Sequence, residues 1–175
     1  CGSKYFIPIS SFTASSSHSS NFLPSDGRLG RRGWAPKTTS NPNDYLQVDL
    51  GFSYFICAVA TQGNIKAPEW VMTFKINVSL NNINWTTYQE NGVNKVFQGN
   101  SENQLIVQHS IKNQFARYIR FIPVMYNLFK TMRVGIFGYQ EACENAPLGM
   151  ELGAIQDDSI TASSAKHLAK NARLN

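Results

Sequence analysis

The feature that most constrains the fold is an alternation of apolar and polar residues along short segments. In residues 72–79 the alternation continues over eight positions, and in residues 45–50 Leu46, Val48 and Leu50 share one face. A period of two residues is that of a β-strand with one buried face, whereas a nearly continuous apolar run is typical of a central strand. Strands are therefore predicted at residues 45–50, 54–61, 72–79, 117–122 and 132–137.

Turn-forming residues separate these segments. They occur at residues 24–27, 41–44, 81–82, 91–92 and 99–100, and each group contains Gly, Pro or Asn. No segment before residue 143 has a convincing helical period. Many short strands joined by such turns predict an all-β fold, an antiparallel jelly-roll or sandwich over residues 5–139 with very little helix.

Composition and charge exclude some classes of protein. Charged residues make up only 15% of the chain, while 11 Phe, 7 Tyr and 3 Trp favour strands. A net charge of +5 favours an anionic partner, such as a phospholipid head group or a sulfated glycan. The basic residues are scattered apart from Arg28, Arg31, Arg32 and Lys37, so no nucleic-acid partner is predicted. No apolar run reaches the length of a transmembrane segment.

The chain contains an internal repeat. Phe12-Thr13-Ala14-Ser15-Ser16 recurs as Ile160-Thr161-Ala162-Ser163-Ser164, at an offset of 148 residues. An offset of this size corresponds to a whole domain. The sequence therefore predicts one domain over residues 1–142 and the N-terminal part of a second, similar domain over residues 143–175.

Cysteines and glycosylation sequons indicate an extracellular protein, either secreted or the ectodomain of a cell-surface protein. Asn77-Val78-Ser79 and Asn84-Trp85-Thr86 are sequons. Cys1 and Cys143 lie near the two ends of the first domain, where a disulfide would tie the termini together. The alternative is that Cys143 pairs within the second domain. Cys57 lies in an apolar run and is interpreted as a free, buried thiol.

No constellation of catalytic residues is present in the sequence. His18, His109 and His167 have no Cys or carboxylate at metal-ligand spacing, and no Ser lies in a nucleophile elbow. His18 lies in a Ser-rich segment and is expected to be solvated. We therefore expect no enzymatic activity, no cofactor and no metal site.

Several segments resemble, in order, the discoidin domain, also called the coagulation factor V/VIII C-type domain. They are Gly33-Trp34-Ala35-Pro36, Asp44-Tyr45-Leu46-Gln47-Val48-Asp49-Leu50-Gly51, Ala60-Thr61-Gln62-Gly63, Trp70-Val71, Phe97-Gln98-Gly99-Asn100 and Ala116-Arg117-Tyr118-Ile119-Arg120-Phe121-Ile122-Pro123. Pro147-Leu148-Gly149-Met150-Glu151 is similar to the opening of the family. One departure is Gly138-Tyr139, where the family usually ends its domain with Gly-Cys.

The resemblance implies an eight-stranded jelly-roll barrel that binds ligands through loops, called spikes, at one end. By resemblance the spikes are residues 17–27, 39–44 and 100–104. Family members bind anionic phospholipid, collagen, glycans or receptor partners. The candidate ligand-binding residues are Asn21, Phe22, Leu23, Asn41, Asn43, Glu102 and Asn103, with Arg31 and Arg32 at the rim.

The predicted function is an extracellular module for cell adhesion or recognition that binds a protein or glycan. The alternative is peripheral binding to anionic phospholipid, with Phe22 and Leu23 as apolar tips. In a further alternative, Phe22 folds back to cap the barrel.

Other side chains are assigned to the scaffold. Trp34 and Trp70 are expected in the core. Asp49, Arg117 and Arg120 are expected to form an ion network, because such groups are seldom buried unpaired.

Overall fold

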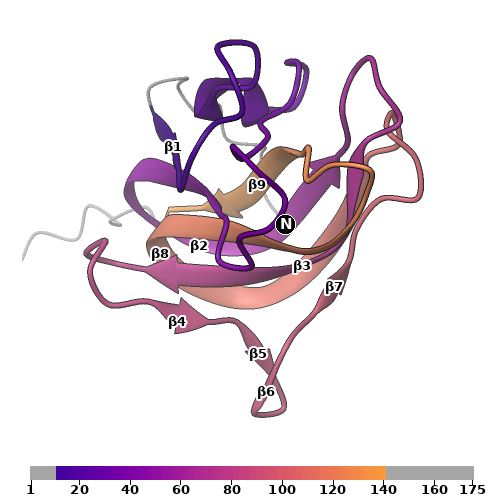
Figure 1. Ribbon diagram of the computed structural model, residues 1–175. Helices are drawn as coiled ribbons and strands as arrows, with labels where there is room; N and C mark the ends of the chain where they lie inside the picture. The colour runs from indigo at the N-terminus through magenta and orange to yellow at the C-terminus, as the bar shows by residue number, and fades with distance from the viewer. Residues whose placement is uncertain (1–10, 141–175) are drawn as a thin grey trace, which may run out of the picture. The chain divides into compact units, whose positions relative to one another are not determined.

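The computed structural model describes residues 11–140, which form a β-sandwich without α-helix (Figure 1). The elements are β1 (Phe12–Ala14), the 3₁₀ turn η2 (Pro24–Gly27), β2 (Leu46–Gln62), β3 (Trp70–Ser79), β4 (Thr86–Thr87), β5 (Gln89–Glu90), β6 (Val93–Asn94), β7 (Phe97–Gln98), β8 (Val107–Asn127) and β9 (Arg133–Tyr139). This confirms the predicted fold class. The predicted second copy, residues 143–175, lies outside the described residues.

Two long strands, β2 and β8, organise the sheet. The strand order is β1-β2-β8-β3-β4, with β9 paired to β2 and β7 paired to β3. The pairing of β2 with β8 is interrupted between Asp49 and Tyr54, where Gly51 has a φ of 78°. The predicted strands at 45–50 and 54–61 are therefore two halves of one strand, of which the first pairs with β1 and the second with β9.

The hydrophobic core takes its buried side chains mainly from β2, β3, β8 and β9. In β3 the side chains of Phe74, Ile76 and Val78 are buried, while Lys75 and Asn77 are half-buried on the other face. They join Val48, Ile56, Ile119, Phe121 and Ile136 in one hydrophobic cluster. The predicted alternation is thus confirmed for residues 74–78, whereas Met72 is exposed, next to the point where the pairing of β3 with β8 shifts.

The two tryptophans assigned to the core differ. Trp34 is fully buried and its indole Nε1 donates to the Ser16 carbonyl at 2.8 Å. Trp70 is only half-buried, because it begins β3 at the edge where the chain leaves the loop 63–69. The prediction was right for Trp34 and wrong for Trp70.

The turn at Asn91-Gly92 joins β5 and β6 as a hairpin. Both residues have positive φ, 52° and 78°. Asn and Gly adopt this left-handed region most readily, which explains why this pair occurs here.

Cys57 corrects one prediction. It takes part in a disulfide and is half-buried, so its interpretation as a free, buried thiol was wrong. The pairing of β2 shifts between Ile56 and Ala58, both of which are buried, and this irregularity turns Cys57 away from the core. The other two cysteines, Cys1 and Cys143, between which a bridge was predicted, lie outside the described residues.

The expected ion network is smaller than predicted. Arg117 binds Asp49 in bidentate fashion, with Nε–Oδ1 at 2.8 Å and Nη2–Oδ2 at 3.0 Å. Arg120 instead donates to Gln47 at 2.8 Å. Its guanidinium carbon lies 4.0 Å from the ring centroid of Tyr45 and 3.8 Å from that of Trp85. Arg120 is therefore held by stacking rather than by a carboxylate.

The disulfide can be checked by peptide mapping under non-reducing conditions. We expect one cross-linked peptide that contains Cys57 joined to either Cys1 or Cys143, with the remaining thiol open to alkylation. A Cys1–Cys143 peptide together with alkylated Cys57 would contradict the structure.

The Asp49–Arg117 pair should make stability depend on pH. The Arg117 hydrogen bonds hold the pKa of Asp49 below its ordinary value of 3.8. The pair therefore stabilises fully above the unfolded-state pKa, and this stabilisation is lost as pH falls through the lowered folded-state pKa. For this partly exposed pair we expect the free energy of unfolding of the wild type to exceed that of Asp49→Asn by about 0.5–1 kcal/mol at neutral pH.

That difference should shrink in urea unfolding at acidic pH. Glu102→Gln removes an exposed carboxylate and serves as the control. A wild-type advantage over Asp49→Asn that stays constant from neutral to strongly acidic pH would contradict the assignment.

Candidate ligand-binding loops

The three predicted spikes, the rim segment 31–32 and two further loops, residues 63–69 and 128–131, form what we call the loop cluster. In Figure 1 the first spike lies at the top of the view, and the loops that follow β2 and β7 lie at the right. Hydrogen bonds join the loops directly. Ile65 N donates to the Arg32 carbonyl at 3.1 Å, and Gly63 N to the Asn103 carbonyl at 3.1 Å.

Arg133, the first residue of β9, ties three segments of the loop cluster together. Its side chain is only 2% exposed. Nε donates to the Gly63 carbonyl at 2.6 Å, Nη2 to the Asn103 carbonyl at 3.1 Å and Nη1 to the Arg31 carbonyl at 3.4 Å. Burial lowers the pKa of Arg133 from its ordinary value. No ion pair with Arg133 is present within residues 11–140, so backbone carbonyls balance its charge.

Gly63 allows these segments to approach one another. A Cβ at this position would lie 2.6 Å from the Glu69 carbonyl oxygen and 2.9 Å from the Asn103 Cα. Any other residue would force the loop 63–69 and the third spike apart. This explains the glycine in the Thr61-Gln62-Gly63 block.

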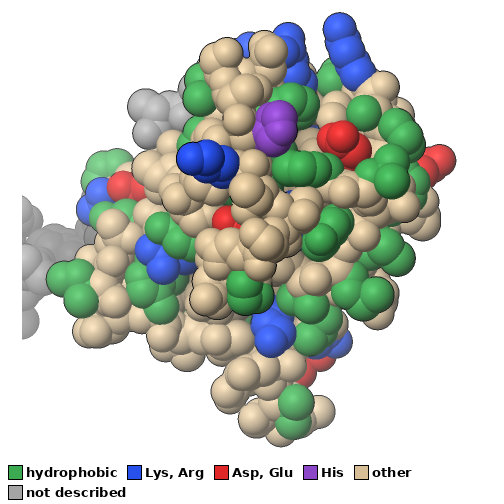
Figure 2. All heavy atoms as spheres, in the orientation of Figure 1, with side chains coloured by type: hydrophobic (Ala, Val, Ile, Leu, Met, Phe, Trp, Pro, Cys, Tyr) green, Lys and Arg blue, Asp and Glu red, His purple; other side chains and the backbone are tan. Residues whose placement is uncertain are grey.

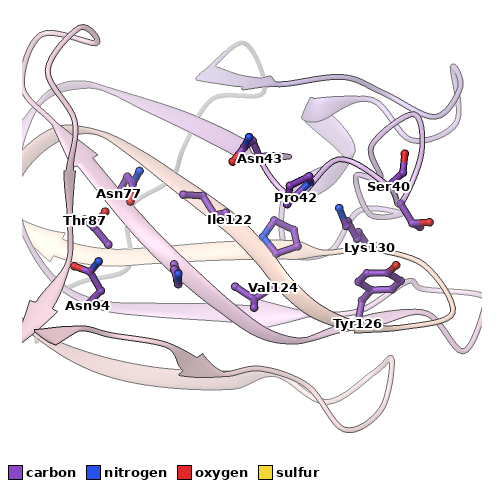
Figure 3. Close-up of a pocket in the computed structure, with 13 residues that line it drawn as sticks. Ser40, Pro42, Asn43, Asn77, Thr87, Asn94, Ile122, Val124, Tyr126 and Lys130 are labelled. Carbon is purple, nitrogen blue, oxygen red and sulfur yellow. The ribbon is translucent and has the colours of Figure 1, made fainter.

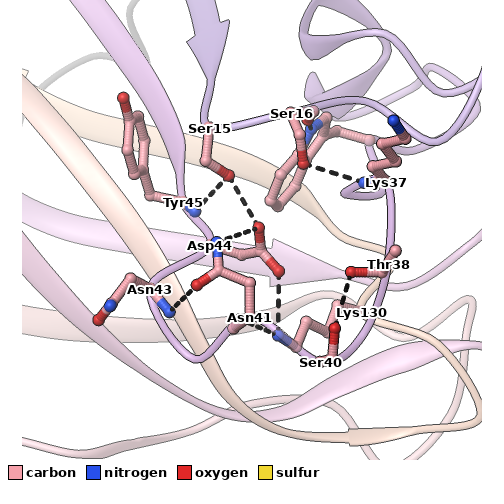
Figure 4. A network of polar contacts seen from close by, with 11 residues as sticks. Ser15, Ser16, Lys37, Thr38, Ser40, Asn41, Asn43, Asp44, Tyr45 and Lys130 are labelled. Carbon is pink, nitrogen blue, oxygen red and sulfur yellow. Dashed lines mark hydrogen bonds and ion pairs between the residues drawn. The ribbon is translucent and has the colours of Figure 1, made fainter.

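A buried ion pair anchors the second spike (Figure 4). Lys130 Nζ lies 3.0 Å from Asp44 Oδ2, and both side chains are almost fully buried. Lys130 also donates to the Asn41 carbonyl, while Asp44 Oδ1 accepts from Ser15 Oγ at 3.0 Å. Breaking such a pair leaves an uncompensated buried charge, so the base of the spike is held firmly.

Aromatic contacts hold the first spike. His18 is exposed, as predicted, but its ring centroid lies 5.8 Å from that of Phe22 and 5.2 Å from that of Phe129, both edge-on. Phe22 is half-buried. Leu23, its neighbour, is 43% exposed. Leu23 is therefore the more exposed of the two predicted apolar tips.

The remaining candidate residues lie mostly at the surface. Asn21, Arg31, Arg32, Asn41, Asn43 and Glu102 are exposed, and Asn103 is half-buried. Arg32 Nη1 donates to Asn21 Oδ1 at 2.6 Å, which joins the first spike to the basic rim. Asn41 Oδ1 accepts from the Asn43 backbone at 3.0 Å. The described contacts connect the third spike to Arg31 through Arg133, and the second spike to loop 128–131 through Lys130.

The side chains in this region are mainly polar and basic. Lys37 and Lys66 are exposed like Arg31 and Arg32. Figure 2 shows several Lys and Arg side chains at the top of the view, among polar surface. An anionic group approaching the loop cluster would meet a favourable field.

Sequence reasoning missed the loop 128–131. Leu128 is 68% exposed and has a φ of 56°, which is unusual for a bulky residue. Strained residues of this kind are enriched at binding sites. The available signal was an apolar pair, Leu128-Phe129, placed between two predicted strands.

The two sequon asparagines differ in exposure. Asn84 is exposed in the turn after β3, whereas Asn77 is half-buried within β3. Residues 11–140 contain no group of three His, Cys, Asp or Glu side chains that could hold a metal ion. In the same span no helix is long and apolar enough to cross a membrane.

The architecture is that of a binding module in which rigid strands carry a cluster of loops at one end. The F5/8 type C domain family matches residues 11–134, so the chain belongs to this family, as predicted.

Individual relatives agree with the family. Neuropilin-1a of Danio rerio is 34% identical over 173 residues, which cover 92% of this chain and 19% of that protein. The chain thus spans about a fifth of the length of this relative.

Solved structures share the fold. Discoidin II of Dictyostelium discoideum aligns with a TM-score of 0.68 and 18% identity, over 75% of this chain and 56% of that one. CBM32-5 of Clostridium perfringens, in complex with GalNAc-β-1,3-galactose, aligns with a TM-score of 0.62 and 16% identity, over 75% and 99%.

Replacing Arg133 should loosen the loop cluster. Arg133→Met keeps most of the side-chain length but leaves three carbonyls without their donor. We expect a loss of about 2–4 kcal/mol in the free energy of unfolding. Hydrogen exchange should also accelerate at the amides of Gly63 and Ile65.

Arg31→Met removes an exposed guanidinium and is the matched control. It should change stability by less than about 0.5 kcal/mol. Equal losses in both variants would contradict the role of Arg133.

Proposed function

We propose that this chain is an extracellular, non-catalytic recognition module that binds a protein or glycan through the loop cluster. The observation that carries the proposal is the contrast between base and tip in these loops. Arg133 and the Asp44–Lys130 pair fix the loop bases, whereas polar and basic tips remain exposed. A site whose backbone is held in advance loses little entropy on binding.

The tip chemistry favours hydrogen-bonded recognition. Asn41, Asn43 and Glu102 offer amide and carboxylate groups, and Arg32 adds a planar donor suited to carboxylate or sulfate. Glycan recognition is supported by the likeness to the CBM32-5 module that was solved with a disaccharide. Protein recognition is supported by the membership of the F5/8 type C domain family.

An extracellular location is supported by covalent features of the chain. A disulfide at Cys57 persists in oxidising compartments, which are those of secreted proteins and ectodomains. The sequons at Asn77 and Asn84 agree with this location.

We further infer that residues 143–175 begin a second module. The repeated Thr-Ala-Ser-Ser and the long alignment with neuropilin-1a support this. Linked copies would strengthen binding through effective concentration.

Anionic phospholipid is the second candidate ligand. Leu23 at 43% and Leu128 at 68% exposure are apolar tips of the loop cluster, which also carries exposed basic side chains. Each exposed basic residue would contribute roughly 1 kcal/mol at an anionic membrane surface. Phe22, half-buried against His18, is less available for this role.

The test measures binding of the full chain to glycan and extracellular-protein arrays and to liposomes with and without phosphatidylserine. For the proposed function, Asn43→Ala and Arg32→Ala should each weaken array binding about tenfold, equivalent to about 1.4 kcal/mol. Lys112→Ala removes a positive charge from an exposed position on β8, outside the loop cluster, and should leave binding unchanged.

Phosphatidylserine-dependent sedimentation that is lost in a Leu23→Ala, Leu128→Ala double variant would favour the membrane alternative. Array binding that tolerates both Asn43→Ala and Arg32→Ala would reject the loop cluster as the binding site.

A further inference from the structure

A groove of about 520 Å³ lies on the outer face of the sheet formed by β3 and β8 (Figure 3). The second spike forms one wall of it through Ser40, Pro42 and Asn43. Ile122 and Val124 of β8 give an apolar floor, and Val124 is 43% exposed. The groove is separate from the polar tips of the first and third spikes.

The asparagine of the first sequon lines this groove. Asn77 lies opposite Arg120 of β8 and Thr87 of β4, so the backbone of β3 is paired on both sides at this position. Its neighbours Ile76 and Val78 point into the core. A group attached to Asn77 would therefore extend over the outer face without disturbing the core.

The Asn77 side chain is one of those that line the groove, as Figure 3 shows. Its Oδ1 is shielded from solvent and has no hydrogen-bond partner within the described residues. N-linked glycans are attached to the side-chain nitrogen of the sequon asparagine.

The groove is lined by the kinds of groups that contact a sugar. A pyranose ring presents apolar C–H faces and hydroxyls around its edge. Ile122 and Val124 offer the apolar surface, while Lys75, Thr87 and Asn94 offer polar groups around it. No ion pair or side-chain hydrogen bond of Lys75 is present within residues 11–140. The volume lies within the range of small-ligand pockets.

We propose that the groove is the seat of the first sugars of an N-linked glycan on Asn77, which pack on the sheet face as part of the folded domain. The proposal rests on the extracellular location proposed above. It assigns the glycan a stabilising role, because its sugars cover apolar surface that is otherwise exposed.

The second sequon provides a contrast within the same chain. Asn84 is exposed and follows a turn in which Asn81 Oδ1 accepts from Ile83 N at 3.0 Å and Asn84 N at 2.9 Å. It borders a smaller hollow of about 410 Å³ but lies outside the paired strands. A glycan on Asn84 should therefore leave stability unchanged.

The experiment uses the full chain, secreted from mammalian cells with an added signal peptide, and the same chain from bacterial periplasm, which adds no such glycan. Wild type, Asn77→Gln and Asn84→Gln are compared in both hosts. Mass spectrometry measures site occupancy and thermal unfolding measures stability. Ser79→Ala is avoided, because Ser79 Oγ accepts from Asn81 N and Asn82 N and supports the turn.

We expect Asn77 to be glycosylated. Asn77→Gln should lower the melting temperature of the secreted protein by about 2–4 °C more than it lowers that of the periplasmic protein. Comparing the effect of Asn77→Gln between the two hosts removes the change in stability that the substitution itself causes. Trimming the glycan to a single N-acetylglucosamine should keep most of the effect, because the groove holds only the first sugars.

An unoccupied Asn77 in the secreted protein overturns the proposal. So do equal losses in both hosts, or equal losses for Asn77→Gln and Asn84→Gln. Ligand binding is measured separately through Arg32→Ala, which lies outside the groove lining, so failure of the proposed function would leave this result intact. Because the added signal peptide directs secretion, glycan occupancy at Asn77 is measured whatever the natural location of the protein.

Discussion

The loop cluster depends on one buried cation, Arg133. Burial of an uncompensated guanidinium would be very costly, so its five N–H donors must find acceptors inside the protein. Carbonyls from three separate segments, at Arg31, Gly63 and Asn103, meet this requirement together. None of the three segments can move away without leaving part of the charge unsatisfied. Arg133, at the start of β9, thus fixes the positions of these three segments relative to one another.

The second spike solves the same problem differently. Lys130 is balanced by the carboxylate of Asp44 rather than by carbonyls alone. In both cases the groups that balance the charge are backbone carbonyls or the Asp44 carboxylate, while the side chains of Asn43 and Glu102 take no part. Residues such as Asn43 and Glu102 can therefore differ between related chains without loss of the fold. This physical separation explains how one sandwich can support many ligands.

The sequence predicted the strands well, because apolar alternation directly reflects the two faces of a sheet. It did not predict that β2 and β8 are continuous, since the irregularity near Gly51 leaves no trace in the hydrophobic pattern. Residues 107–116 were missed because six of the ten are polar, so the segment carries little apolar signal. Arg133 was overlooked and Cys57 was misjudged for the same reason. Their environments are made by segments far away in the chain, which local pattern cannot reveal.

The same limitation affected the candidate tips. An apolar pair in a predicted spike drew attention to Phe22, yet its ring contacts His18, which in turn contacts Phe129. These edge-to-face contacts join the first spike to loop 128–131, while the neighbouring Leu128 is exposed and at positive φ. A bulky residue costs free energy in this conformation, and the cost is accepted only where the surroundings impose it. Leu128, which no sequence motif indicated, is therefore the apolar group best presented to a partner of the loop cluster.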